Sequence, residues 1–458
     1  MPRNFIEKTI EAPAEMLEYG VESGQKIAHN LAKGKGNKSL QHVKNYWYML
    51  GPGLTTGASD DDPSGIATYS QAGAQNGFGL LWTAALTLPL MAVIQEVCAR
   101  IGLVTGRGLA ANIRQHFGKR TLYASATLLF AANTFNIGAD IGAMATATQL
   151  VIKLNTTLLV VGTTLLILLL QIFTPYVRYA KYLKWLALIL LAYIVSAILA
   201  RPNWGDVAKN TFVPHLTFTK SNLILLCAVL GTTITPYLFF WQTSQEIEEE
   251  VALGKVTIAE RKGSDKVSIK RMRVDVWTGM TFSNTVMFFI IAACASVLFA
   301  HGITNINTAA QAAVALRPFA GSASFYLFAV GIVGMGLLAI PVMAGSSAYA
   351  ISESFGKRQG LNSKLKQGYA FYGVIIISML VGLGINFLGI NPIKALIYSA
   401  VANGIVAPII LVQIMLLARN KKIMGDWKNG KISGSLGWIL VVLMVFAGIA
   451  AIYSIVSP

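Results

Sequence analysis

The chain has 458 residues, of which 54% are hydrophobic and only 12% are charged. A soluble protein exposes so much surface to water that about a quarter of its residues are charged, so this composition excludes a set of soluble domains. The apolar residues fall into repeated blocks of roughly 18–25, each long enough to cross a bilayer core of about 30 Å, whereas a β-barrel would show segments of about 10 residues with alternating polarity. We therefore expect an all-α polytopic protein of the cell membrane.

Eleven apolar segments follow one another along the chain. They cover about residues 46–78, 80–104, 121–150, 154–174, 182–200, 221–244, 276–301, 322–350, 368–388, 392–418 and 435–456. Residues 1–45 are polar and charged, which predicts a cytoplasmic tail rather than a signal peptide. The three cysteines lie in or beside apolar segments without metal-ligand spacing, so no disulfide pairing is indicated.

The basic residues between these segments predict the topology. Of the 37 Lys and Arg residues, 30 lie in residues 1–45, 105–120, 175–184, 245–275, 351–367 and 419–434. By the positive-inside rule these stretches are cytoplasmic, so the N-terminus is cytoplasmic and the C-terminus extracellular. The net charge of +17 is explained by this topology, with contacts to anionic lipids, and indicates no nucleic-acid partner.

The first and sixth segments are interrupted by proline. The first contains Asp60-Asp61-Asp62-Pro63-Ser64-Gly65, and the sixth contains Gly231-Thr232-Thr233-Ile234-Thr235-Pro236-Tyr237. Proline removes a backbone donor and disfavours helix at the preceding residue, and unpaired backbone at membrane depth is tolerated only where it is buried or lines a polar cavity. One such proline would be read as a simple kink. Two, each opening a five-span half, indicate a transporter with inverted repeats and a midplane site.

This pattern divides the chain into four parts. The N-terminal tail covers 1–45, the first repeat 46–200, the second repeat 201–418 with a cytoplasmic loop at 245–275, and the eleventh helix with its preceding loop 419–458.

Five carboxylates lie in or near the hydrocarbon region, where a charge is costly and marks an ion or proton path by default. Asp62, directly before Pro63, is the best ligand candidate, and Asp60 and Asp61 could support the break from other faces. Glu96 has a simpler explanation, because Arg100 follows it by four residues on the same helix face. For Asp140, an interhelical hydrogen bond and a role in transport both stay open.

If the two breaks face each other, Asp62 lies opposite Thr232 and Thr235. A carboxylate, hydroxyls and freed carbonyls are hard oxygen donors that suit Mg²⁺, Ca²⁺ or Mn²⁺. An amino-acid zwitterion is the alternative cargo, but the three aspartates favour a cation. We find no His-Glu-x-x-His and no Gly-x-Ser-x-Gly, so an enzyme is not expected.

At these residues the chain resembles the NRAMP family of divalent-metal transporters. The resemblance covers the first ten segments and is most specific in Gly51-Pro52-Gly53, Asp62-Pro63-Ser64-Gly65 and the stretches 71–82 and 99–106. It implies a LeuT-type fold, two inverted five-helix repeats and alternating access. We expect a monomer in the lipid bilayer that moves its metal as substrate and needs no cofactor.

The chain departs from the family at several site positions. Asp62 matches the aspartate of the family motif Asp-Pro-Gly-Asn, but Gly65 takes the place of its asparagine. In the sixth segment, where the family has Ala-x-x-Met-Pro-His, Thr232, Thr235 and Tyr237 stand at the alanine, methionine and histidine positions. A polar glutamine of the tenth span corresponds approximately to Asn403. The expected metal-site residues are thus Asp62, Gly65, Thr232, Thr235, Tyr237 and Asn403.

These departures predict a change of cargo and of coupling. Loss of the thioether removes the soft donor that favours transition metals, and a wider site suits Mg²⁺, which keeps several waters. The pattern is similar to the NRAMP-related magnesium transporters; neutral drift in a manganese transporter is the alternative. Tyrosine does not titrate near neutral pH, so proton coupling is expected to be weak or absent. The predicted function is uptake of Mg²⁺, and also Mn²⁺; a proton-coupled Mn²⁺/Fe²⁺ transporter is the alternative.

Overall fold

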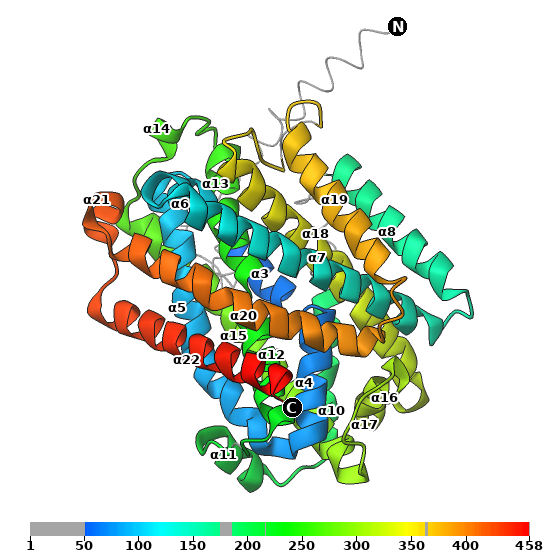
Figure 1. The fold of residues 1–458 in the computed structure, drawn as a ribbon. Coiled ribbons are helices and arrows are strands. Elements are labelled where there is room, and N and C mark those ends of the chain that lie inside the picture. Colours follow the sequence, from blue (N-terminus) through cyan, green and yellow to red (C-terminus); the bar gives the residue numbers. More distant parts are fainter. Residues whose placement is uncertain (1–50, 175–185, 216, 362–364, 458) are drawn as a thin grey trace, which may run out of the picture.

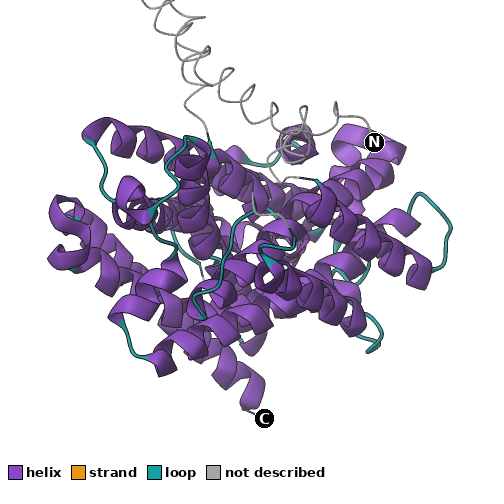
Figure 2. Ribbon diagram, turned by 90° about the horizontal axis from the view of Figure 1, so that it is seen from above, coloured by secondary structure: helices purple, strands orange, loops and turns teal. Residues whose placement is uncertain are grey.

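The structure, a computed structural model, describes residues 51–174, 186–215, 217–361 and 365–457. Within these ranges all regular secondary structure is helical (Figure 2). The predicted tail 1–45 and the basic stretch 175–184 lie outside the described residues. By length and composition, seven described helical runs can cross a membrane, or eight if Leu188–Leu199 and Trp204–Phe212, bent by 119°, form one span. The prediction of a polytopic all-α protein is confirmed.

The first five predicted segments are present as helices, the first of them broken in two. They are α3 (Pro52–Asp60) with α4 (Pro63–Asn76), α5 (Leu81–Thr105), α7 (Lys119–Gln149), α8 (Thr156–Phe173) and α10 (Leu191–Leu199). Although α7 has 31 residues, its small and polar side chains keep it below the hydropathy expected of a membrane span. Such side chains allow close packing against neighbouring helices.

The second half repeats this arrangement. It consists of α12 (Lys220–Thr233) with α13 (Pro236–Ala252), α15 (Lys266–Val297), α18 (Ser324–Ser354), α19 (Tyr369–Ile385) and α20 (Pro392–Arg419), followed by α22 (Lys431–Val456). Helices α13 and α15 extend far into the loop expected at 245–275, and only residues 253–265, including α14 (Ile258–Arg261), connect them. Hydropathy detects the apolar part of a helix and not its polar, solvated extension.

Short helices gather at the two ends of the bundle. Figure 1 shows α6 (Leu109–His116), α14 and α21 (Lys421–Met424) at one end, and α11 (Trp204–Phe212), α16 (Ala309–Ala313) and α17 (Arg317–Ala320) at the other. Three of the strongly basic stretches, 105–120, 245–275 and 419–434, therefore share one end. This placement agrees with the predicted alternation of the connections.

Helix α3 is fixed directly on the backbone of α15. A Cβ atom at Gly57 would lie 2.2 Å from the carbonyl oxygen of Gly279, and one at Gly279 would lie 2.1 Å from that of Gly53, so only glycine permits this approach. The Asp275 carboxylate of α15 accepts hydrogen bonds from the backbone N–H groups of Gly51 (2.8 Å), Gly53 (2.6 Å) and Leu54 (3.1 Å). One carboxylate thus satisfies donors that the start of a helix leaves unpaired.

The outer helices carry the lipid-facing surface. Exposed large apolar side chains include Leu165 and Leu169 on α8, Ile377 on α19, and Val442 and Ile449 on α22. In contrast, α3, α4, α12 and α13 are mostly buried. The two broken spans therefore lie inside the bundle.

Candidate metal site at the two helix breaks

The first break is built around Asp62. Helix α3 ends at Asp60 and α4 begins at Pro63, where the missing N–H of proline is tolerated. Asp62, the N-cap of α4, has extended backbone, and its Oδ1 accepts the backbone N–H of Gly65 at 2.7 Å. The Ser64 hydroxyl donates to the same oxygen at 2.8 Å. These bonds stabilise the start of α4 and fix the orientation of the Asp62 carboxylate.

The second break has the same proline and a different cap. Helix α12 ends at Thr233, α13 begins at Pro236, and Thr235 is the N-cap with extended backbone. The Thr235 hydroxyl does not cap its own helix, and within the described structure this buried oxygen has no hydrogen-bond partner. A buried hydroxyl without a partner is a candidate ligand.

The two breaks lie side by side. The Ser64 and Thr232 hydroxyls are 3.3 Å apart. A Cβ atom at Gly65 would lie 3.3 Å from Thr232 Oγ1 and 3.4 Å from Asp62 Oδ1, so these three residues surround one point. Thr232 therefore lies across the first break from Asp62, as expected if the breaks face each other; no hydrogen bond joins Asp62 to Thr235 in the described structure.

Two tyrosines extend this contact between the broken spans. Tyr69 Oη lies 3.0 Å from Thr233 Oγ1. Tyr237 Oη donates to the backbone carbonyl of Ser59 at 3.2 Å, and the carbonyl of Tyr237 accepts from the Ser346 hydroxyl at 2.7 Å. The bond to Ser59 fixes the hydroxyl of Tyr237 beside the first break, where its oxygen can still accept.

The space between the breaks is closed to solvent. The polar residues expected there are all 0% exposed: Asp62, Thr232, Thr235, Tyr237 and Asn403. Water therefore does not reach these side chains in this structure.

Asn136 of α7 belongs to this site, although the sequence did not single it out. Its Nδ2 donates to Asp62 Oδ2 at 2.8 Å and lies 2.9 Å from Met343 Sδ of α18. Its Oδ1 accepts from the Ser399 hydroxyl of α20. Asn136 thus connects the first break to three further helices, and Met343 brings a sulfur atom into the network that the expectation of oxygen alone did not include. A signal existed: Asn136 lies one helical turn before Asp140.

Two further polar residues are buried without a hydrogen bond in the described structure. Asn403 of α20 has neither amide atom paired, and α20 packs on both α4 and α12. Neither carboxylate oxygen of Asp140 is paired, and this group interacts electrostatically with Asp62. The backbone N–H of Ser64 on α4 lies near this carboxylate, so Asp140 faces the first break. A buried polar group without a partner can bind an ion or a water molecule, so both residues are candidate ligands.

The other predicted acidic residues each have at least one identified partner, although Asp60 Oδ1 and Asp61 Oδ2 are buried without one in the described structure. The Ser283 hydroxyl of α15 donates to Asp60 Oδ2 at 2.6 Å and lies 3.4 Å from Asp61 Oδ1, so both carboxylates turn toward α15. The predicted pair of Glu96 and Arg100 is confirmed at 3.6 Å.

The chemistry of this donor set fits a small hard cation. No group of three or more His, Cys, Asp or Glu side chains able to hold a metal is found in the described residues. A cation between the breaks would instead meet one carboxylate, neutral hydroxyl and amide oxygens, and the carbonyls freed at the C-terminal ends of α3 and α12. Those helix ends carry partial negative charge, which favours a cation.

Comparison with known proteins identifies related sequences and folds. A family model described as "Natural resistance-associated macrophage protein-like" matches residues 53–454. A solved structure of the Eremococcus coleocola manganese transporter, bound to an aromatic bis-isothiourea substituted compound, is 19% identical with a TM-score of 0.70 and covers 92% of this chain and 89% of its own. Mhp1, a nucleobase-cation-symport-1 family transporter, is 16% identical with a TM-score of 0.54, covering 89% of this chain and 91% of its own. At such identities the likeness concerns the fold, and the expected LeuT-type architecture is confirmed.

Proposed function

Since the chain belongs to the natural resistance-associated macrophage protein-like family of divalent-metal transporters, we propose that its cargo binds where the two broken helices meet. The protein is a transporter and not an enzyme. Membership of this family implies a divalent cation as cargo, and the residues at the breaks support a particular place for it.

The observation that carries this proposal is the environment of Asp62. Its carboxylate is fully buried, and its hydrogen-bond partners are the neutral groups of Gly65, Ser64 and Asn136. A buried carboxylate without a cationic partner is costly inside a membrane protein. A divalent cation at this point would supply the missing charge.

The remaining ligands follow from unused polar atoms. Thr235 and Asn403 each hold buried oxygens without a partner, and Thr232 Oγ1 faces Asp62 across the break. Gly65, at the position of the family asparagine, contributes no side-chain ligand. In this proposal Asp62, Thr232, Thr235 and Asn403 hold the ion, and Gly65 and Tyr237 line the space around it.

Manganese is the first candidate for the cargo, because the similar solved structure is that of a manganese transporter. Magnesium is a second candidate, favoured by Thr235 at the position of the family methionine. The thioether of Met343 lies 2.9 Å from Asn136 Nδ2, the atom that also donates to Asp62, so a soft donor stands beside the first break and favours manganese. The magnesium proposal, and with it the likeness to the magnesium branch, rests on Thr235 alone.

We further propose that proton coupling is weak. Tyr237 stands where the family has a titratable histidine, and its hydroxyl is bonded to Ser59. An inside-negative potential contributes about 2.3 kcal/mol per charge per 100 mV, and therefore roughly twice that for a divalent ion. This driving force suffices for uptake without protons. The unpaired Asp140 carboxylate is the group that would carry a proton if this proposal is wrong.

The test is ion uptake and competition in proteoliposomes that contain an internal pH reporter. We expect Mn²⁺ to enter the vesicles and Mg²⁺ either to enter or to compete with Mn²⁺. The vesicle lumen should acidify little. Asp62→Ala should abolish transport, whereas Asp426→Asn, an exposed carboxylate in a connection, should leave it unchanged.

The outcomes separate the three claims. Normal transport by Asp62→Ala would overturn the site. If Mn²⁺ enters and Mg²⁺ neither enters nor competes, the magnesium candidate fails. Acidification of the lumen in step with metal entry would overturn weak coupling.

A further inference from the structure

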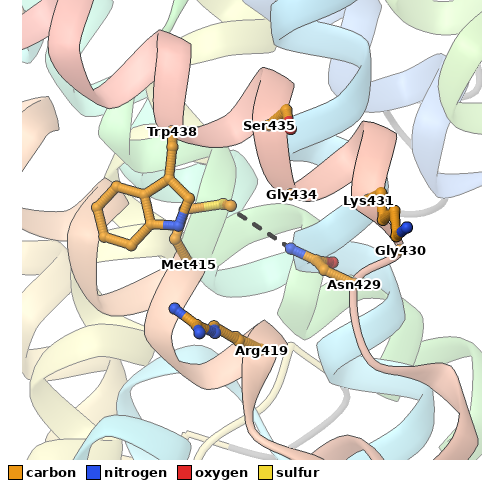
Figure 3. A pocket seen from close by; sticks show the side chains of 8 residues that line it. All are labelled: Met415, Arg419, Asn429, Gly430, Lys431, Gly434, Ser435 and Trp438. Atoms are coloured by element: carbon orange, nitrogen blue, oxygen red, sulfur yellow. Dashed lines mark hydrogen bonds between the residues drawn. The ribbon is translucent and has the colours of Figure 1, made fainter.

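A cavity of about 380 Å³ lies between the end of α20 and the start of α22, remote from the two helix breaks. Figure 3 shows Trp438 and Met415 on one side of it, Arg419 below, and Asn429 and Lys431 opposite. None of the described residues that line it is acidic. The cavity belongs to the basic connection at 419–434 that the sequence marked as cytoplasmic.

The lining is positively charged and unneutralised. Arg419 and Lys431 are exposed, and neither takes part in an ion pair within the described structure. Helix α22 begins at Lys431 after Gly430, and no side chain caps its first N–H groups. The start of a 26-residue helix adds partial positive charge and free donors to those two side chains.

A third cation lies directly behind the cavity. The Arg100 guanidinium, on a side chain only 6% exposed, donates to Oδ1 of the lining residue Asn429, and its Nε has no hydrogen-bond partner in the described structure. Glu96 lies 3.6 Å from Arg100 and 2.9 Å from Arg273, so one carboxylate serves two guanidinium groups. Because Glu96 is shared with the half-exposed Arg273, it neutralises the buried Arg100 only in part, and the remaining positive charge beneath Asn429 favours an anion in the cavity.

The position of the cavity identifies where that anion comes from. Immediately beyond Trp438, α22 exposes Ile439, Val442, Phe446 and Ile449, which form a lipid-facing surface. Tryptophan favours the boundary between the lipid and the aqueous phase, and basic clusters beside a membrane helix attract anionic lipids. A headgroup in the cavity would continue into acyl chains along α22.

We propose that this cavity is a binding site for the phosphate headgroup of an anionic phospholipid of the cytoplasmic leaflet. Arg419 and Lys431 bind the phosphate together with the N–H groups at the start of α22, and Trp438 packs against the glycerol region. The site rests on the cavity and its charges, and it is independent of the transported ion.

Trp438 provides a local probe for the test. The full-length protein in detergent is titrated with phosphatidylglycerol or phosphatidylcholine carrying brominated acyl chains, which quench nearby tryptophan. The part of the quenching that disappears in Trp438→Phe reports the cavity. We expect half-maximal quenching of Trp438 at a phosphatidylglycerol concentration about 30-fold lower than that of phosphatidylcholine. Each of the two basic residues contributes about 1 kcal/mol near an anionic lipid, and 1.4 kcal/mol corresponds to a tenfold change.

Two matched double variants test whether Arg419 and Lys431 bind the headgroup. Arg419→Gln with Lys431→Gln should remove the preference for phosphatidylglycerol. Lys421→Gln with Lys422→Gln removes the same charge from the same connection, outside the cavity lining, and should keep it. Equal thermal unfolding midpoints of the two variants show that both are folded.

Three results would overturn the proposal. The first is that the two lipids quench Trp438 at the same concentration. The second is that the two double variants change the preference for phosphatidylglycerol equally. The third is that inorganic phosphate alone displaces the brominated lipid. The last would assign the cavity to a soluble phosphate compound.

Discussion

At the residue scale, Asp62 combines a structural and a functional task. Oδ1 accepts two hydrogen bonds, from Ser64 and Gly65, and so fixes the start of α4. Oδ2 accepts one, from Asn136, and a carboxylate oxygen has room for about two. The oxygen that is not needed for the helix cap is therefore the one with capacity left for a cation.

The Thr235 position provides a prediction about selectivity. Thr235→Met places a thioether at the second break, and a soft donor favours Mn²⁺ and Cd²⁺ over Mg²⁺. We expect the Mn²⁺-to-Mg²⁺ ratio in competition uptake to rise by about tenfold, which corresponds to about 1.4 kcal/mol. Thr285→Met, the same change at an exposed position of α15, is the control and should not alter the ratio. An unchanged ratio in Thr235→Met would place the hydroxyl outside the ion site.

The sequence predicted some of these residues and not others for a physical reason. Pro63 and Pro236 mark the breaks locally, so Asp62, Thr232 and Thr235 could be found beside them. Asn136 is 74 positions away from Asp62, in a helix with many other small and polar residues. Its partner is determined by how α7 packs on α4, and no local pattern contains that information.

At the element scale, α3 is a short, separately held unit. It has nine residues, and Asp61 and Asp62 separate it from α4. Its closest approach to α15 is between backbone atoms at Gly53, Gly57 and Gly279. Even one methyl group at this contact would push the two helices apart.

Gly57→Ala tests this contact. The new Cβ would lie 2.2 Å from the Gly279 carbonyl oxygen, so one helix must shift, and overpacking of this kind costs about 1–3 kcal/mol. We expect a lower thermal unfolding midpoint and reduced transport. Gly162→Ala in α8 is the matched control, because nothing lies within 4 Å of its Cβ and alanine favours a helix. If both variants unfold at the same temperature, α3 is not held on α15 as described.

Hydropathy predicted the spans more accurately than their ends. The tenth segment, expected at 392–418, is α20 at Pro392–Arg419. The seventh, expected from residue 276, begins ten residues earlier at Lys266, where the Asp265 side chain caps α15 by accepting the N–H of Ser268. The polar first turns of this helix need water and a cap rather than lipid, so they carry no hydropathy signal. Helix α11 was missed for the same reason.

At the scale of the whole molecule, the two ends of the bundle differ in charge, and this difference predicts its orientation. A cysteine introduced as Lys209→Cys in α11 should react with a membrane-impermeant maleimide added to intact cells. Lys428→Cys, at the opposite end, should react only after the membrane is made permeable. The native cysteines Cys98, Cys227 and Cys294 are all buried and give little background. The reverse labelling pattern would invert the assigned topology.

The repeat architecture was predictable as a whole, but its contacts were not. Two prolines in corresponding positions indicated inverted halves, and the halves do meet through α4 and α12. The pairing of α7 with α18, or of α12 with α20, depends on the shapes of whole helix faces. Such long-range partners are specified jointly by many side chains and cannot be derived from one segment.

The Asp275 cap gives α3 a preferred direction of release. At the far end α3 terminates in the sealed interior, where exposed peptide groups would find no substitute for their protein partners. At the Asp275 end, Gly51 is already partly exposed, so separating α3 from α15 there lets water hydrate both the carboxylate and the three N–H groups that it held. If α3 separates from α15, we therefore expect the separation to begin at its Gly51 end, at the basic end of the bundle.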